Sequence, residues 1–120
     1  MALILAVDDS VTIREMMKVI LSNAGHQVVT AEDGQEALEE AQKRNFDMFF
    51  CDVNMPKMSG ITLVGKLREL PQYEHTPMIM VTTEYEEYRK KIAKRKGATG
   101  WLEKPVTEER LLKAVNKLVG

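Results

Sequence analysis

Three acidic residues stand at the ends of short apolar runs in this chain. Asp8 and Asp9 follow the run 2–7, and Asp52 closes the run 47–52. If these runs are neighbouring parallel strands, the carboxylates meet and repel by several kcal/mol, on the order expected at an effective dielectric constant of about 20. A hard divalent cation such as Mg²⁺ relieves that repulsion more economically than raised pKa values do. The alternative is that these acids only begin solvated loops; their joint placement favours the metal site.

Two further polar groups fall at the ends of later apolar runs. Thr82 ends the run 77–82, and Lys104 follows the run 100–103 just before Pro105. Each alone is an ordinary strand or surface residue. Together, a hydroxyl and an ammonium are the donors that hold the oxygens of a phosphoryl group, since phosphoryl transfer asks mainly for positioning and charge neutralisation. The pattern therefore predicts phosphoryl chemistry on a carboxylate.

The elements that must position these groups alternate between strand and helix along the chain. One apolar stripe has helical spacing, and its helix is stopped at Gly25. Asp33 can cap a second helix, with Glu36 closing the capping box, and Pro71 stops a third. Five such units with short connections predict an α/β fold, a parallel sheet with helices on both faces. The expected strands are 2–7, 27–31, 47–52, 77–82 and 100–103; the stripe is Ile13, Met16, Met17, Ile20, Leu21 and Ala24; and the third helix spans about 60–70, before a plain loop over 71–76.

Composition narrows the class of protein. The 120 residues suffice for one domain with its own core, and we expect a single domain over 1–120. A net charge of −1 gives no general attraction to nucleic acid or to a membrane, and one cysteine forms no internal disulfide. The apolar start reaches Asp8 too early for a signal peptide, and no apolar run approaches about 20 residues. We therefore expect a cytoplasmic protein without nucleic-acid or membrane partners.

The chemistry-bearing residues and their neighbours resemble the response-regulator receiver domain, of the single-domain CheY-like type, over essentially the whole chain. The resemblance implies the flavodoxin-like doubly wound sheet with five helices, and its strand order 2-1-3-4-5 comes from that resemblance alone. The segments that carry it are Asp8-Asp9, Asp52-Val53-Asn54-Met55-Pro56 with Ser59-Gly60, Val81-Thr82-Thr83-Glu84, and Gly100-Trp101-Leu102-Glu103-Lys104-Pro105.

The resemblance also implies residue roles. Asp52 would accept a phosphoryl group from a histidine kinase, with Thr82 and Lys104 as phosphoryl ligands. Mg²⁺ would be bound by Asp9 chiefly, with Asp8, Asp52 and the backbone carbonyl of Asn54. A cis peptide bond would precede Pro105. The domain would be a switch with self-phosphorylation and self-dephosphorylation rather than an enzyme acting on a separate substrate.

In receivers, the strand-four hydroxyl moves inward on phosphorylation and an aromatic residue on strand five follows. Those positions are Thr82 and Trp101 here. The face built from helix four, strand five and helix five would then bind a downstream protein, and a phosphatase is a further possible partner. Residues 89–96 hold six basic residues among eight, which indicates either a solvated helix or a docking surface for an acidic partner.

Other functions compete with this interpretation. A haloacid-dehalogenase-type phosphatase also uses a strand-end aspartate, Mg²⁺ and a lysine, but needs a second acid where Asn54 stands. A flavodoxin-like nucleotide binder fits less well, because acids occupy its phosphate position. A degenerate receiver would lack some of the five key residues. Chemotaxis is the expected pathway, and an intermediate in a phosphorelay that passes the group to a histidine phosphotransfer protein is the alternative.

Overall fold

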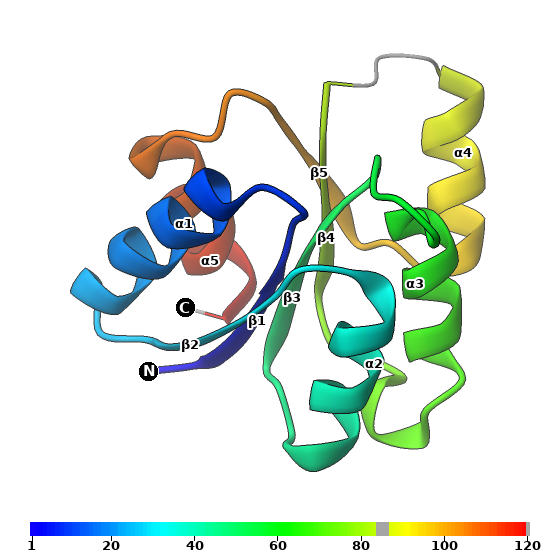
Figure 1. Ribbon diagram of the computed structural model, residues 1–120, viewed down its shortest axis with the longest axis horizontal. Helices are drawn as coiled ribbons and strands as arrows, with labels where there is room; N and C mark the ends of the chain where they lie inside the picture. The colour runs from blue at the N-terminus through cyan, green and yellow to red at the C-terminus, as the bar shows by residue number, and fades with distance from the viewer. Residues whose placement is uncertain (84–86, 120) are drawn as a thin grey trace.

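The computed structural model describes residues 1–83 and 87–119, so the end of the Val81–Glu84 segment lies outside the described residues. Five strands alternate with five α-helices, as predicted (Figure 1). Every strand matches its expected range to within one residue. The strands are β1 (Leu3–Val7), β2 (Gln27–Ala31), β3 (Met48–Asp52), β4 (Met78–Thr82) and β5 (Gly100–Glu103); the helices are α1 (Val11–Asn23), α2 (Gly34–Lys43), α3 (Gly60–Arg68), α4 (Glu87–Lys96) and α5 (Glu108–Val119).

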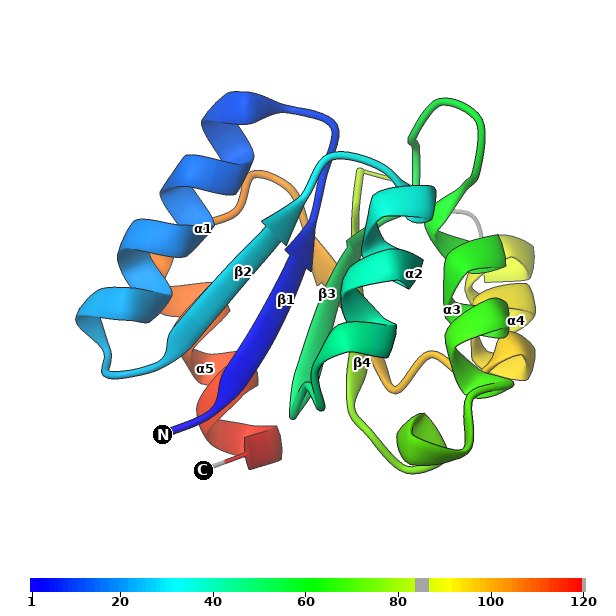
Figure 2. The same cartoon turned by 60° about the horizontal axis from the view of Figure 1, so that its bottom comes forward.

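The five strands form one parallel sheet in the order β2-β1-β3-β4-β5, which confirms the flavodoxin-like order. Helices α1 and α5 cover one face, and α2, α3 and α4 cover the other (Figures 1 and 2). The register pairs Val7 with Cys51, Asp52 with Val81, and Thr82 with Glu103. Since parallel strands share one carboxyl edge, this register brings the residues that end β1, β3, β4 and β5 together.

Side-chain alternation along the buried central strands builds a separate core on each face of the sheet. Phe49 and Met80 face the side of α2 and α3, whereas Phe50 and Val81 face α1 and α5. Every residue of β3 and β4 is buried, as the nearly continuous apolar runs indicated. Burying a large apolar side chain contributes about 1.5–3 kcal/mol, so these two layers fix the carboxyl edge rigidly.

Polar side chains begin four of the helices. Ser10, Asp33, Ser59 and Thr107 each accept a hydrogen bond from a backbone N–H in the first turn of α1, α2, α3 and α5. The cap at Asp33, which accepts from the Glu36 N–H at 2.8 Å, was predicted. Among the described residues, no helix has the length and apolar character needed to cross a membrane.

The region after α3 differs from the prediction. The helix ends at Arg68 rather than near Leu70, and a 3₁₀ turn, Pro71–Tyr73, occupies the start of the expected plain loop. Leu70 is extended, as a residue before proline tends to be, so the helix stops short of it; two contacts distant in sequence hold the turn that follows. Arg68 donates hydrogen bonds to the carbonyl of Gly97 at 2.8 and 3.0 Å, and the buried Tyr73 hydroxyl lies 2.5 Å from the Ala41 carbonyl oxygen.

His26 and Cys51 have structural places away from the carboxyl edge. His26 is partly buried, and its Nδ1 accepts a hydrogen bond from the Ala2 N–H at 3.0 Å. Cys51 is a small buried core residue. Burial, and then the neighbouring Asp52 charge, raises the pKa of the Cys51 thiol to about 12.

Candidate functional site

Three carboxylates meet at the carboxyl edge of the sheet, where the sequence placed them. One oxygen from each of Asp8, Asp9 and Asp52 can be chosen so that all three lie within 4.8 Å of one another. Asp8 is fully buried and Asp52 is 2% exposed, while Asp9 is exposed. Two acids are thus fixed beneath a third that faces solvent. Asn54 is exposed in the loop after β3, and its place in a metal site stays a prediction.

The loop after β1 is held by three short contacts. The Asp8 N–H donates to the Ala31 carbonyl at 3.1 Å, and Asp8 Oδ1 accepts from the Ser10 N–H at 2.9 Å. Arg14, from the second turn of α1, donates to the Asp8 carbonyl oxygen at 2.7 Å. These contacts leave Asp8 Oδ2 directed to the site rather than to its own loop.

Lys104 supplies the cation of the site. Its Nζ lies 3.0 Å from Asp52 Oδ1 and 3.6 Å from Asp8 Oδ2, and its side chain is 25% exposed. The Lys104 N–H donates to the Thr82 carbonyl at 2.9 Å, and Thr82 itself is fully buried. The peptide bond between Lys104 and Pro105 is cis, which confirms that expectation. The structure therefore brings the acids, the threonine and the lysine to one edge.

The acids and the lysine shift one another's titration. The pKa of Asp52 is raised to about 6, chiefly by burial. The charge of Asp8 raises this pKa further, whereas Lys104 lowers it. Burial likewise raises the pKa of Asp8, against the hydrogen bond from Ser10. Burial alone would lower the pKa of Lys104, but its contacts with Asp52 and Asp8 raise it. The site carries more negative charge than one lysine neutralises.

The donor set fits a divalent cation. Apart from the Lys104 ion pair, Asp8 Oδ2 and Asp52 Oδ1 are buried without a hydrogen-bond donor from any described residue. Such atoms are costly unless something compensates their charge. Oxygen ligands from carboxylates, with an exposed Asp9 open to water, are the chemistry that Mg²⁺ prefers. The acidic cluster can hold a metal of this class.

Trp101, the expected switch aromatic, lies on β5 and is paired with Met80 of β4. It is partly buried against the α2–α3 side of the sheet, and Lys90 Nζ of α4 lies 5.4 Å from the centre of its ring. Its indole N–H is buried and has no acceptor among the described residues. An unpaired buried donor costs about 1–3 kcal/mol, so an arrangement that gives it an acceptor would be favoured.

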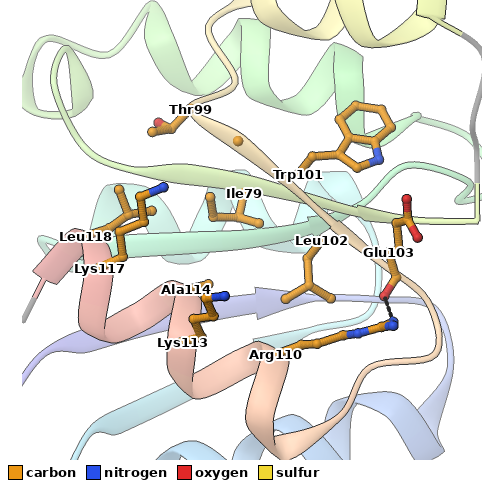
Figure 3. Close-up of a pocket in the computed structure, with 11 residues that line it drawn as sticks. Ile79, Thr99, Trp101, Leu102, Glu103, Arg110, Lys113, Ala114, Lys117 and Leu118 are labelled. Atoms are coloured by element: carbon orange, nitrogen blue, oxygen red, sulfur yellow. Dashed lines mark hydrogen bonds between the residues drawn. The ribbon is translucent and has the colours of Figure 1, made fainter.

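A groove of about 630 Å³ runs between β5 and α5 (Figure 3). Leu102 and Trp101 project from opposite sides of β5, with Leu102 toward α5. The groove has an apolar floor and a mostly cationic rim. Its floor includes Ile79, Leu102, Ala114 and Leu118, and its charged lining is Glu103, Arg110, Lys113 and Lys117.

Comparison with known proteins identifies the family that shares this arrangement of residues. The family model of the response regulator receiver domain matches residues 4–116. The chain belongs to this family. This receiver domain is 38% identical over 119 residues to protein PilH of Pseudomonas aeruginosa, covering 99% of the chain and 98% of PilH. It is 37% identical over 119 residues to the chemotaxis protein CheY homolog of Campylobacter jejuni, covering 98% of the chain and 92% of the homolog.

Solved structures agree with the sequence relatives. Chemotaxis protein CheY4 of Vibrio cholerae superimposes on this receiver domain with a TM-score of 0.96 and 49% identity, covering 98% of each chain. A CheY-like receiver domain protein of Methanospirillum hungatei gives a TM-score of 0.91 at 28% identity, covering 98% of this chain and 92% of that one. Receiver domains are signalling switches that take phosphoryl groups from histidine kinases and bind downstream targets.

The sequence did not lead us to predict a role for three residues around the site. Ser10 and Arg14 hold the loop of Asp8, and Arg110 donates to the carbonyls of Glu103 and Pro105, at 3.2 Å in each case. Ser10 could have been predicted, because a serine directly before a helical stretch is a capping signal. The two arginines carry no local signal, because their side chains reach back across a helix start to backbone atoms.

Proposed function

We propose that this receiver domain accepts a phosphoryl group on Asp52 with the help of Mg²⁺, and that the modified form presents a changed face to a protein target. The observation that supports this most strongly is the position of Lys104, 3.0 Å from Asp52 Oδ1 at the mouth of the acidic cluster. A lysine so placed meets the charge of an incoming phosphoryl group.

The transfer itself needs few parts. A carboxylate oxygen of Asp52 attacks phosphorus, a new O–P bond forms, and the bond from phosphorus to the donor's oxygen or nitrogen breaks as the donor departs with its electron pair. The Lys104 ammonium neutralises charge on the phosphoryl oxygens, and Thr82 offers its hydroxyl to one of them. A pKa for Asp52 raised to about 6 still leaves the carboxylate ionised, and nucleophilic, at neutral pH.

Asp8, Asp9 and Asp52 would hold the metal, with the Asn54 carbonyl as a further ligand. When bound, Mg²⁺ neutralises the charge that these acids and the phosphoryl oxygens share. The chain's own contribution is to keep Asp8 fixed through Ser10 and to leave Asp9 exposed to solvent. The same set supports self-phosphorylation from small donors and self-dephosphorylation by water.

The changed face would be that of α4, β5 and α5. Movement of Thr82 toward the phosphoryl group would alter the space beside Trp101, whose ring contacts Lys90 and so links β5 to α4. The groove between β5 and α5 offers apolar contacts under a mostly cationic rim, which suits an acidic protein segment (Figure 3).

Relatives named for chemotaxis favour that pathway. In it, a histidine kinase would be the phosphodonor and a downstream protein the target, with a phosphatase as a further partner. The domain would act in the cytoplasm. A phosphorelay intermediate has the same chemistry at Asp52 and differs in what receives the group. Transfer from the phosphorylated domain to a histidine phosphotransfer protein would favour the relay over direct output.

The test is incubation with acetyl phosphate, with and without Mg²⁺, followed by intact mass measurement. We expect one phosphoryl adduct that requires Mg²⁺ and is absent from Asp52→Asn. Glu15→Gln, an exposed acid on α1, is the matched control and should be modified like the wild type. An adduct that survives in Asp52→Asn would contradict the proposal, as would the absence of any adduct from both acetyl phosphate and a phosphorylated kinase.

A further inference from the structure

Two arginines occupy equivalent places on the two helices that cover one face of the sheet. Arg14 lies six residues after Asp8, and Arg110 lies six residues after Lys104. Each sits in the first or second turn of the helix that follows its functional residue, α1 or α5, and these helices pack side by side (Figure 2). Both side chains point back to backbone carbonyls at or just after the end of the preceding strand.

The contacts are directed at the functional residues themselves or their immediate neighbours. Arg14 Nη1 donates to the carbonyl oxygen of Asp8 at 2.7 Å. Arg110 Nη1 donates to the carbonyl oxygens of Glu103 and Pro105, both at 3.2 Å, so it holds the residue before Lys104 and the residue after it. Figure 3 shows the Arg110 side chain extended from α5 to the Glu103 carbonyl.

These loops need such support because the charges on their side chains attract and repel one another. Asp8 and Asp52 repel each other, while Lys104 attracts both, so electrostatics alone pulls the two loops in different directions. A lysine side chain also loses up to about 2 kcal/mol of conformational freedom when it is ordered. Guanidinium groups have rigid, multiple donors, which suits them to fix carbonyl oxygens in one geometry.

We propose that Arg14 and Arg110 are paired positioning residues, Arg14 for the Asp8–Asp9 loop and Arg110 for Lys104. The functional consequence rests on the proposed phosphoryl chemistry: Arg14 would sustain metal affinity, and Arg110 would keep the lysine beside Asp52. Since Arg110 also lines the groove between β5 and α5, one side chain belongs both to that groove and to the support of Lys104.

The test is amide hydrogen exchange by NMR in Arg14→Gln and Arg110→Gln, without metal or phosphodonor. The Ser10 N–H, bonded to Asp8 Oδ1, reports the first loop, and the Lys104 N–H, bonded to the Thr82 carbonyl, reports the second. We expect Arg14→Gln to speed exchange of Ser10 alone by about five- to tenfold, and Arg110→Gln to speed exchange of Lys104 alone by a similar factor.

Each variant is the control of the other, and exposed lysines about one turn further along provide matched controls, Lys18→Gln on α1 and Lys113→Gln on α5. Equal effects of both arginine variants on both amides would indicate general loosening and overturn the proposal. Unchanged exchange at both amides would overturn it as well. Arginine-to-lysine variants keep the charge; full restoration of protection by lysine would refute a role for guanidinium geometry.

A second readout separates positioning from simple support of the fold. Calorimetric titration with Mg²⁺ should show affinity weakened about threefold or more by Arg14→Gln and not weakened by Arg110→Gln, since a loosened Lys104 competes less with the metal for Asp8 and Asp52. A weakening by both variants, or by neither, would overturn the assignment for Arg14. If the wild type binds no Mg²⁺ and takes no phosphoryl group, the proposed function fails, while the exchange measurement still decides whether the arginines hold the two loops.

Discussion

Replacing Asp52 by asparagine should stabilise the folded protein at neutral and alkaline pH in the absence of Mg²⁺. Asp52 is 2% exposed, and burial followed by the charge of Asp8 raises its pKa from 3.8 to about 6. A higher pKa in the folded state means that ionisation opposes folding. At about 1.4 kcal/mol for each pH unit, the ionised carboxylate costs the folded state about 3 kcal/mol above pH 6.

The pH dependence has a definite sign. Below about pH 3.8 the carboxyl is protonated in both folded and unfolded states and contributes no difference. Between pH 3.8 and 6 the folded state binds more protons, so this group lowers stability as the pH rises, and its full cost is present above pH 6. The asparagine variant escapes this cost, so its advantage should grow from near zero at pH 4 to about 2–3 kcal/mol at pH 8.

Urea unfolding followed by circular dichroism, in EDTA at pH 4 and pH 8, measures the difference. Glu15→Gln, which removes an exposed acid on α1, should change stability by less than about 0.5 kcal/mol at either pH. Mg²⁺ should stabilise the wild type more than Asp52→Asn and narrow the gap at pH 8. A variant that is less stable than the wild type at pH 8, or an advantage equal at both pH values, would refute the electrostatic account.

Three further substitutions or labels test the surroundings of the site. Gly60→Ala should prevent folding or cost more than about 3 kcal/mol in urea unfolding, because its Cβ would lie 2.1 Å from the Asp52 carbonyl oxygen; Gly65→Ala in the same helix has room and should stabilise by about 0.5–1 kcal/mol. Tyr73→Phe should lower the unfolding free energy by about 1–3 kcal/mol, since the buried Tyr73 hydroxyl meets two carbonyl oxygens, and an unchanged midpoint would count against those bonds. Cys51 should resist a disulfide reagent at pH 8 until urea unfolds the chain, because its pKa is raised to about 12; rapid labelling of the native protein would contradict its burial.

The alternation of apolar runs with helical patterns was enough to predict the strands and the fold class. Runs over 47–52 and 77–82 are apolar throughout because β3 and β4 are covered on both faces, and such strands leave an unambiguous pattern. The gathering of Asp8, Asp52 and Lys104 followed from strand order and the common edge of a parallel sheet. The order itself came from resemblance, because local sequence does not specify which strands become neighbours.

Contacts that bridge distant segments could not be predicted. Arg68, at the end of α3, donates to the Gly97 carbonyl, and the hydroxyl of Tyr73, in the 3₁₀ turn, donates to the Ala41 carbonyl. Both depend on where a long side chain ends, which no local pattern encodes. The contacts of Arg14 and Arg110 could not be predicted for the same reason. The helical pattern around each arginine indicates only that it lies on the polar face of its helix.

The central claim is that Asp52 carries the phosphoryl group, and borohydride trapping tests it most directly. Reduction of an acyl phosphate converts the modified aspartate to homoserine, and tryptic cleavage after Arg44 and Lys57 releases a peptide that holds both Asp52 and the exposed Asp47 as an internal control. After incubation with acetyl phosphate and Mg²⁺, sequencing of that peptide by mass spectrometry should place homoserine at position 52 only. Homoserine at position 47, or an unreduced peptide from protein that carries a phosphoryl adduct, would contradict the account.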